Sequence, residues 1–380
     1  MKSKLLVGLI ASLAATGAFA QSTVTVYGVI DTAIRSTTNQ ASSSGPASAT
    51  ELSEGAFQGN RLGFKGSEDL GGGTTAIFKL ENGFVSGTGA IDQQGQIFGR
   101  QAWVGLSNAN YGTVTLGRQY GAAFQVLGNY DPIGWGNFVE NEWELFLIGI
   151  RFDNSVDYTN TWGPVSVTAQ YSIGGQAGAS SIGHSDGIGA TYTQGPFSIG
   201  AVYQGSLGCA GGSLDATMCS PSGMRLWGIG GTMNVSMATL YLNYYNIARG
   251  ADFGKAGSNS GGPLANTSML GNGGNPNQRT DDYWSAGVSV TPNPAWTFYL
   301  AFMHDGANCV NTMCQNGTTQ TVYFIADYNL SKRTDIYFEI DGSKVGGAEI
   351  LDPNSPFNFA STMDGADSRT GVGLGLRTHF

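Results

Sequence analysis

Apolar and polar residues alternate along most of the chain from Thr23 onward, in short segments separated by turn-rich stretches. In the segment 165–173 every second residue is apolar or aromatic, with serine, threonine and glutamine between them. The segments 296–302 and 335–341 repeat the alternation, the second with acidic residues at polar positions. Residues two apart on a strand share a face. Each segment therefore predicts a β-strand with one apolar and one polar face.

The connections between these segments alternate in length. Short turns are expected at residues 68–73, 108–112, 161–164, 194–196, 234–236, 291–295 and 329–333. Longer polar stretches lie between them, for example 36–58, 250–280 and 343–368. Short turns on one side and long loops on the other are typical of transmembrane β-barrels. Seven turns and eight longer connections predict an all-β, antiparallel barrel of sixteen strands with an aqueous lumen. A soluble sandwich is the alternative source of the alternation.

The amino terminus has two lysines within its first four residues, an apolar run at Leu5–Ala15 and small residues at Ala18–Ala20. This pattern predicts a secretory signal peptide, residues 1–20, that is cleaved to leave a single domain, residues 21–380. An amino-terminal anchor is the alternative, but the run is about half of the roughly 20 residues that a spanning helix needs. No later apolar stretch is longer, so a membrane-bound form must be a barrel.

Composition agrees with β-structure and argues against several function classes. Glycine contributes 59 of 380 residues, and only 12% of residues are charged. Loss of residues 1–20, with their two lysines, changes the formal charge from −9 to −11. This acidity disfavours nucleic-acid binding. Glycine pairs such as Gly371 and Gly373 lack the strand-turn-helix setting of a phosphate loop. We expect no cofactor.

Four cysteines form two close pairs in polar, glycine- and asparagine-rich segments: Cys209 with Cys219, and Cys309 with Cys314. In an oxidising compartment they predict two local disulfides, one of three possible connectivities. Zinc is the alternative, but it favours CxxC-like spacings with histidines. The chain has three histidines, His184, His304 and His379. Their scatter also argues against a catalytic Ser/His/Asp set, so we expect no metal site and no enzymatic activity.

The chain ends in an alternating segment in which Val372, Leu374, Leu376, Thr378 and Phe380 share one face. A terminal aromatic residue on a final amphipathic strand resembles the assembly signal of outer-membrane barrels. Together with the amino-terminal leader and the alternation, Phe380 favours insertion into an outer membrane.

Five stretches carry a family resemblance: 24–31 (VTVYGVID), 61–73 (RLGFKGSEDLGGG), 78–84 (FKLENGF), 112–120 (GTVTLGRQY) and 329–334 (NLSKRT). Through them the sequence resembles the Gram-negative porins of β-proteobacteria over nearly the whole mature chain. The resemblance implies a homotrimer of barrels in outer-membrane lipid and lipopolysaccharide, passing ions and small hydrophilic solutes by diffusion. It also implies a third outer loop folded into the lumen, which residues 119–148 match in position and length. An ordinary outer loop and a plug are the alternatives for this segment.

A passive channel sorts ions with fixed charges at its narrowest point. Arg61 and Arg151 lie in opposite phase to their apolar neighbours, which predicts that both face the lumen. Arg100 falls at the alternating positions that apolar residues occupy, so alternation does not place it in the lumen. The resemblance assigns it, together with Arg61 and Arg151, to a basic wall at the narrowest point of the pore. Arg118, at the end of its strand, is a further candidate. Each could instead be a solvated wall residue with no influence on selectivity.

Lys79 and Glu81 are adjacent in lumen phase on one predicted strand and are expected to line the pore. The acidic candidates on the inward loop are Asp131, Glu140, Glu142 and Glu144. Each of these acids could instead hold the loop to the wall through hydrogen bonds. The acidic total charge favours a slight preference for cations, although the local field outweighs total charge at a narrow pore.

Two further functions stay open. A substrate-specific channel of the same fold, for a sugar, an organic acid or a nucleotide, would need an ordered stack of lumen aromatics. Tyr27, Tyr299, Tyr323 and Tyr337 lie in inner phase but are spread along the chain. A soluble secreted adhesin would partition into the periplasm or medium without detergent.

Overall fold

The computed structural model describes residues 22–136, 148–175, 183–210, 220–251, 253, 275–352 and 365–380. The strands are β1 (Thr23–Gln40), β2 (Ala47–Glu54), β3 (Arg61–Gly71), β4 (Thr74–Gly83), β5 (Gln101–Asn108), β6 (Gly112–Tyr120), β7 (Arg151–Trp162), β8 (Val165–Ser172), β9 (Ser185–Gln194), β10 (Phe197–Ala210), β11 (Ser220–Val235), β12 (Ala238–Arg249), β13 (Arg279–Asn293), β14 (Trp296–Asn308), β15 (Gly317–Asn329), β16 (Thr334–Gly347) and β17 (Ser368–His379). Short helical segments are η1 (Gln93–Gly95), α2 (Ala122–Leu127), η2 (Gly128–Tyr130) and η4 (Ala348–Leu351).

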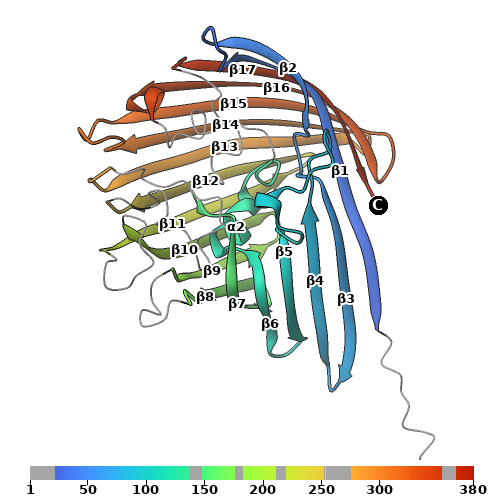
Figure 1. The fold of residues 1–380 in the computed structure, drawn as a ribbon. Coiled ribbons are helices and arrows are strands. Elements are labelled where there is room, and N and C mark those ends of the chain that lie inside the picture. Colours follow the sequence, from blue (N-terminus) through green and yellow to red (C-terminus); the bar gives the residue numbers. More distant parts are fainter. Residues whose placement is uncertain are drawn as a thin grey trace, which may run out of the picture.

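The strands form one closed antiparallel barrel (Figure 1). From β3 onward each strand pairs with the next, and β17 pairs with β1 to close the sheet. β2 pairs with residues 32–40 of β1, whereas β3 pairs with residues 23–29. β2 and β3 are thus two halves of one barrel strand, and the seventeen segments make sixteen strands. The predicted strand number and all seven predicted short turns are confirmed.

The break between β2 and β3 is built around the buried Asp31 carboxylate. Its Oδ2 accepts backbone N–H groups from Phe57 and Gln58 at 3.1 and 3.0 Å, and the Tyr337 hydroxyl donates to its Oδ1 at 2.7 Å. A Cβ on Gly55 would lie 1.6 Å from Asp31 Oδ1, so only glycine fits there. The expected long connection at 36–58 is therefore mostly strand, with only residues 41–46 between β1 and β2.

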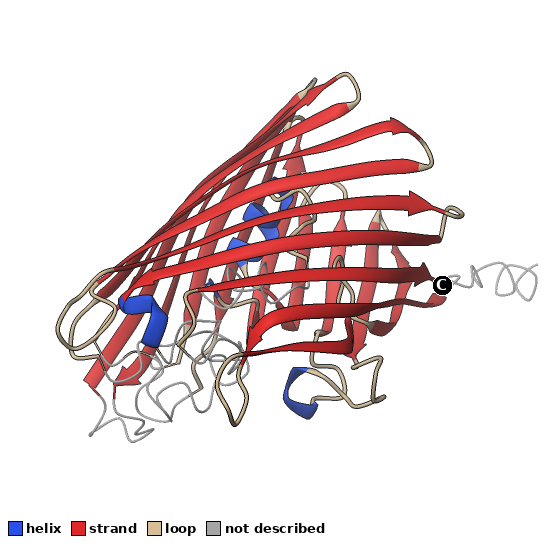
Figure 2. Ribbon diagram, turned by 90° about the horizontal axis from the view of Figure 1, so that it is seen from above, coloured by secondary structure: helices blue, strands red, loops and turns tan. Residues whose placement is uncertain are grey.

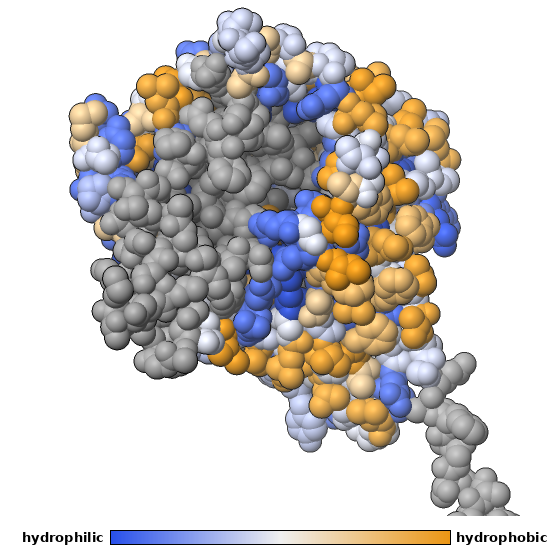
Figure 3. Space-filling view, viewed as in Figure 1, coloured by the Kyte–Doolittle hydropathy of each residue, from blue (hydrophilic) through white to orange (hydrophobic). Residues whose placement is uncertain are grey.

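The barrel is apolar outside and polar inside. On β8, Tyr171 is 47% exposed, whereas Thr168 and Gln170 on the other face are buried. Apolar side chains cover much of the outer wall near β1, β3 and β4 (Figure 3). This inside-out arrangement is the one that lipid around a water-lined lumen requires. Among the described segments, no helix is long and apolar enough to cross a membrane.

The last strand has the predicted apolar outer face, since Leu374, Leu376 and Phe380 are at least half exposed. Gly28 N–H donates to the Phe380 carbonyl at 3.0 Å, and Phe380 N–H returns the bond to the Gly28 carbonyl at 3.1 Å. The terminal residue thus takes part in closing the barrel. Its role as an assembly signal stays a prediction.

The apolar core lies inside the barrel, where helical segments are visible behind the strands in Figure 2. There α2 packs on β9–β11, and η2 contacts β11 and β12. A Cβ on Gly228 would lie 2.9 Å from Leu127, and a Cβ on Gly230 would lie 2.4 Å from Tyr130. Glycine at these positions of β11 allows the helical segment to lie directly on the sheet. The segment after β6 therefore turns into the barrel over residues 121–136, and residues 137–147 lie outside the described part.

Candidate functional site

Basic side chains from neighbouring strands meet at the outer halves of β3–β7, on the lumen side. Arg61 begins β3, Lys79 lies on β4, Arg100 directly precedes β5, Arg118 lies near the end of β6, and Arg151 begins β7. Antiparallel pairing places the start of one strand beside the end of the previous one. The barrel thus gathers basic residues that are about 20 to 30 positions apart in the sequence.

Glu81 is the acidic centre of this group and is 1% exposed. Its Oε1 lies 2.9 Å from Arg100 Nε, and its Oε2 lies 3.4 Å from Lys79 Nζ. The Tyr27 hydroxyl donates to the same Oε2 at 2.7 Å. Lys79 and Glu81 therefore lie side by side, and Glu81 is buried among the basic groups.

Tyr120 joins two of the arginines and was not among the site residues expected from sequence. Its hydroxyl accepts hydrogen bonds from Arg100 Nη2 at 3.0 Å and Arg151 Nη2 at 3.4 Å. The Arg151 guanidinium also lies 4.9 Å from the Tyr120 ring centroid, and this ring stacks on Phe124 at 4.3 Å. By strict alternation Tyr120 would share the outer face of Val114 and Leu116, and the irregular pairing of β6 with β7 between Gly117 and Gln119 turns it inward, so the alternation provided no signal for it.

Arg100 reaches the lumen although its parity is that of Val104 and Leu106, which are more than half exposed on the outer face. The reason is that β5 begins at Gln101, so the strict alternation of a strand does not extend to Arg100. Its backbone N–H donates to the Glu81 carbonyl at 3.2 Å, which fixes its position on the wall.

Arg118 and Arg61 differ in how the wall holds them. Arg118 donates from Nε to the Gly99 carbonyl at 2.6 Å and from Nη1 to Asp153 Oδ1 at 2.7 Å. Arg61 Nε donates to the Gly59 carbonyl at 3.1 Å, and the side chain is within electrostatic reach of Arg100 and Glu81. Across the described residues, Arg61 and Arg151 form no ion pair with a carboxylate.

The Asp131 carboxylate organises its own loop. Its Oδ1 accepts the backbone N–H groups of Ile133 at 3.0 Å and Trp135 at 2.9 Å, and the residue is 3% exposed. Burial raises the pKa of this carboxyl to about 6, against the opposing effect of the backbone N–H groups. This geometry favours the loop-holding alternative for Asp131. The other expected acids, Glu140, Glu142 and Glu144, lie outside the described residues.

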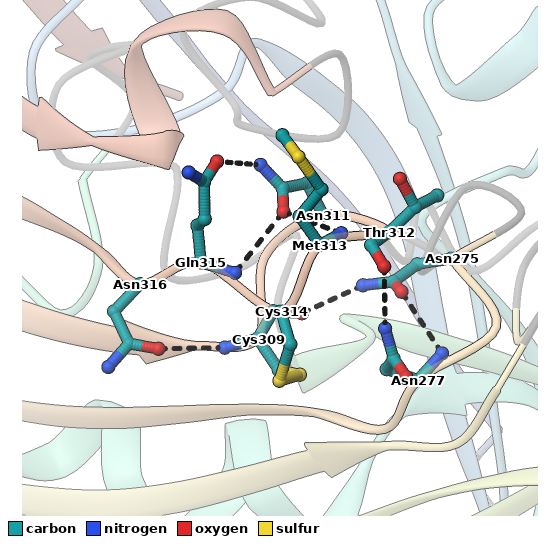
Figure 4. The surroundings of a disulfide bond; sticks show 9 residues. All are labelled: Asn275, Asn277, Cys309, Asn311, Thr312, Met313, Cys314, Gln315 and Asn316. Atoms are coloured by element: carbon teal, nitrogen blue, oxygen red, sulfur yellow. Dashed lines mark hydrogen bonds between the residues drawn. A yellow bond between two sulfur atoms is a disulfide. The ribbon is translucent and has the colours of Figure 1, made fainter.

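The predicted disulfide between Cys309 and Cys314 is confirmed and lies in the connection between β14 and β15 (Figure 4). Asn275 Nδ2 donates to the Cys309 carbonyl at 2.7 Å, and Cys309 N–H donates to Asn316 Oδ1 at 3.1 Å. The bridged turn is thus fastened to the segment before β13. Cys219 and the side chain of Cys209 lie outside the described part, so that disulfide stays a prediction.

Three of the four tyrosines expected in inner phase make contacts within the barrel wall. Tyr27 binds Glu81, whereas Tyr299 and Tyr337 make edge contacts with Phe57, with ring centroids 5.4 and 5.1 Å apart. These contacts lie at two separate places on the barrel wall. They do not form the ordered stack of aromatic rings that a substrate-specific channel would need.

A closed sixteen-stranded barrel with an apolar exterior, a polar interior and basic groups on its inner wall defines the class of water-filled outer-membrane channels. A model of the Gram-negative porins matches residues 8–347. The chain is 29% identical to an outer membrane porin of Bordetella pertussis, with 100% of both chains covered. It is 28% identical to outer membrane porin protein 32 of Delftia acidovorans, with 98% of each covered.

Solved structures agree on the fold. The anion-selective porin from Comamonas acidovorans superposes with a TM-score of 0.72 at 22% identity, covering 95% of this chain and 100% of that one. The trimer form of OmpT of Vibrio cholerae gives a TM-score of 0.65 at 15% identity, covering 94% of this chain and 99% of that one. The chain belongs to the Gram-negative porin family and forms a diffusion channel in the outer membrane. Its family and fold are those of channels rather than enzymes.

Proposed function

We propose that Arg61, Arg100 and Arg151 form a basic constriction wall that makes this channel prefer anions. The supporting observation is that Arg61 and Arg151 have no carboxylate partner among the described residues. In the same part of the chain, Arg151 Nε has no hydrogen-bond acceptor at all. Unmatched guanidinium groups attract small anions and offer them hydrogen bonds.

This proposal reverses the slight cation preference expected from the total charge. Glu81 pairs with Arg100 and Lys79, and Asp153 pairs with Arg118. Among the described residues, five basic groups against these two acids leave a charge of +3 on this side of the pore. Salt screens exposed charges beyond about 8–10 Å, so this local group acts more strongly on a permeating ion than acids in distant loops. The related structure described as an anion-selective porin is consistent with this reading.

Residues 119–148 are proposed to narrow the pore opposite this wall. The packing of α2 and η2 on the glycines of β11 holds the first part of this segment inside the barrel. Stacking of Tyr120 on Phe124 couples the basic wall to it. Glu140, Glu142 and Glu144 are the proposed acids of the facing side, and a transverse field between the two sides would then order water in the pore.

Assembly as a homotrimer is part of the proposal, as are cleavage of residues 1–20, contact with lipid and lipopolysaccharide, and absence of catalysis. An apolar groove on the outer wall, lined by Ile34, Leu52, Trp296 and Leu374 among others, is proposed as subunit or lipid contact area. The trimer form of the Vibrio cholerae relative supports this assembly. For catalysis, the described histidines lie before β9, on β14 and at the end of β17, too scattered for one site.

Reversal potentials in a salt gradient across planar bilayers test the basic wall. We expect the wild-type channel to favour chloride over potassium, and Arg61→Ala and Arg151→Ala each to shift the reversal potential toward cation preference. Arg333→Ala, in the exposed turn after β15, is the control and should leave it unchanged. A cation-selective wild-type channel, or equal potentials in all four proteins, would overturn the proposal. Equal uptake of unrelated small solutes by liposomes would separate general diffusion from a substrate-specific channel.

A further inference from the structure

Six buried ionisable side chains meet at the outer ends of β12–β14, beneath η4. They are Arg249, Arg279, Asp281, Asp305, Glu349 and Asp352, none more than 5% exposed. Two arginines and four carboxylates carry a net charge of −2 when all are ionised. Burying a charge without an opposite charge beside it is costly. The ion pairs within this group therefore show whether a further positive charge is needed.

The two arginines form ion pairs with three of the four carboxylates. Arg249 pairs with Asp281, and Arg279 lies 2.9 Å from Asp281 Oδ1. Arg279 also forms ion pairs with Glu349 and Asp352, so its guanidinium joins the barrel wall to the η4 segment.

Asp305 is the carboxylate left over. It is 2% exposed, forms no ion pair with a described residue, and its Oδ1 has no hydrogen-bond donor within the described part of the chain. One carboxylate oxygen from each of Asp281, Asp305 and Glu349 lies within 4.8 Å of the others. The unpartnered group therefore points into a small space that is already lined by two other carboxylates.

Local packing brings Glu349 to this place. Gly347 has φ +63°, a conformation that favours glycine, and the next residue, Ala348, donates its N–H to the Asn316 carbonyl at 2.9 Å. A Cβ on Gly317 would lie 2.6 Å from Glu349 Cγ, so the absence of a side chain there lets η4 rest directly on β15. The Glu349 carboxylate is thus positioned by a tight turn.

We propose that Asp281, Asp305 and Glu349 bind one Ca²⁺ that holds η4 to the outer rim of the barrel. Ca²⁺ takes oxygen ligands at about 2.3–2.6 Å, so two ligands on opposite sides of it are up to about 5 Å apart, which the 4.8 Å limit allows. Its charge equals the −2 that the arginines leave. Mg²⁺ fits less well, because its shorter bonds of about 2.0–2.1 Å and strict octahedral geometry need closer oxygens.

Terbium luminescence in the detergent-extracted, full-length protein tests this site, because Tb³⁺ replaces Ca²⁺ and is excited by nearby tyrosine. Tyr283 is the cross-strand partner of Asp305 and would serve as the donor. Wild type, Asp305→Asn and Asp327→Asn are titrated with Tb³⁺, and bound Tb³⁺ is then displaced with Ca²⁺ or Mg²⁺. Asp327 is the matched control: it is also buried with one unpartnered oxygen, but it lies beside Asp335 and Arg377. Lipopolysaccharide that copurifies binds cations equally in all three proteins.

We expect saturable luminescence that Ca²⁺ displaces better than Mg²⁺, unchanged in Asp327→Asn and at least 10-fold weaker in Asp305→Asn. If Asp305→Asn fails to fold, thermal unfolding of the wild type decides: a higher transition temperature in Ca²⁺ than in EDTA supports the site. The same titration curve in all three proteins would assign the signal to lipopolysaccharide and overturn the proposal. No calcium-displaceable signal, together with no effect of EDTA on unfolding, would mean that Asp305 is neutralised by a proton and would also overturn it.

Discussion

The negative charge of Glu81 partly cancels the positive charge of the basic wall, so neutralising Glu81 should strengthen the preference for anions. In Glu81→Gln the local charge rises by one, while the side chain keeps one carbonyl oxygen as an acceptor for Arg100 or Tyr27. A unit charge acts on an ion about 8 Å away with about 0.5 kcal/mol in water. Because the effect has opposite sign for anions and cations, the permeability ratio should rise roughly fivefold at low salt. Screening reduces this to about twofold near physiological salt.

The same substitution should lower stability. Glu81 is 1% exposed and pairs with Arg100 at 2.9 Å. Removing one partner of a buried ion pair costs about 3–5 kcal/mol, and the retained acceptor places the expected loss near the lower end. Loss of stability and gain of anion preference together would distinguish a buried counter-ion from an acid that faces the pore.

The assay is the reversal potential in a potassium chloride gradient, measured at low and at physiological salt, with thermal unfolding measured in parallel. Glu68→Gln removes the same charge from an exposed position near the end of β3, at the opposite end of the strand from Arg61, and should leave the reversal potential unchanged. A Glu81→Gln channel with unaltered selectivity at low salt would refute the reasoning, since an added charge next to the permeation path must act on ions there.

Other predictions concern the inward segment and the outer rim. Gly230→Ala should displace Tyr130, cost about 1–3 kcal/mol and change single-channel conductance, whereas Gly231→Ala, whose Cβ would meet only a carbonyl at 3.2 Å, should not. Burial raises the pKa of Asp131 from 3.8 to about 6, so the folded protein binds this proton more tightly than the unfolded chain does. The free energy of unfolding should therefore be highest below about pH 4 and fall as the pH rises toward 6. Asp131→Asn should remove this dependence in unfolding curves measured from pH 4 to 7; persistence of the slope would contradict it. Cys314→Ser should destabilise the outer turn by about 2 kcal/mol, seen as faster proteolysis there without loss of the barrel.

The sequence by itself determined the repeating elements. The alternation at 165–173 predicts a strand because side chains of a strand point to opposite faces, and this holds wherever one face meets lipid and the other water. The same rule predicted that Arg61 and Arg151 face the lumen, although at Arg151 the alternation is interrupted, since the neighbouring Phe152 is buried as well. The spacing of polar turns then determined the number of strands, since a barrel cannot leave an edge unpaired in lipid.

Only the tertiary structure decided which charges meet. Arg100 departs from the strand phase because it precedes β5, and Glu81 is buried because neighbouring strands bring Arg100 and Tyr27 to it. Asp305 and Glu349 are 44 positions apart and come together through the fold of η4 onto the rim. Alternation fixes a side chain's face but not its height or its cross-strand neighbours, which depend on register, and register becomes definite only when the barrel closes.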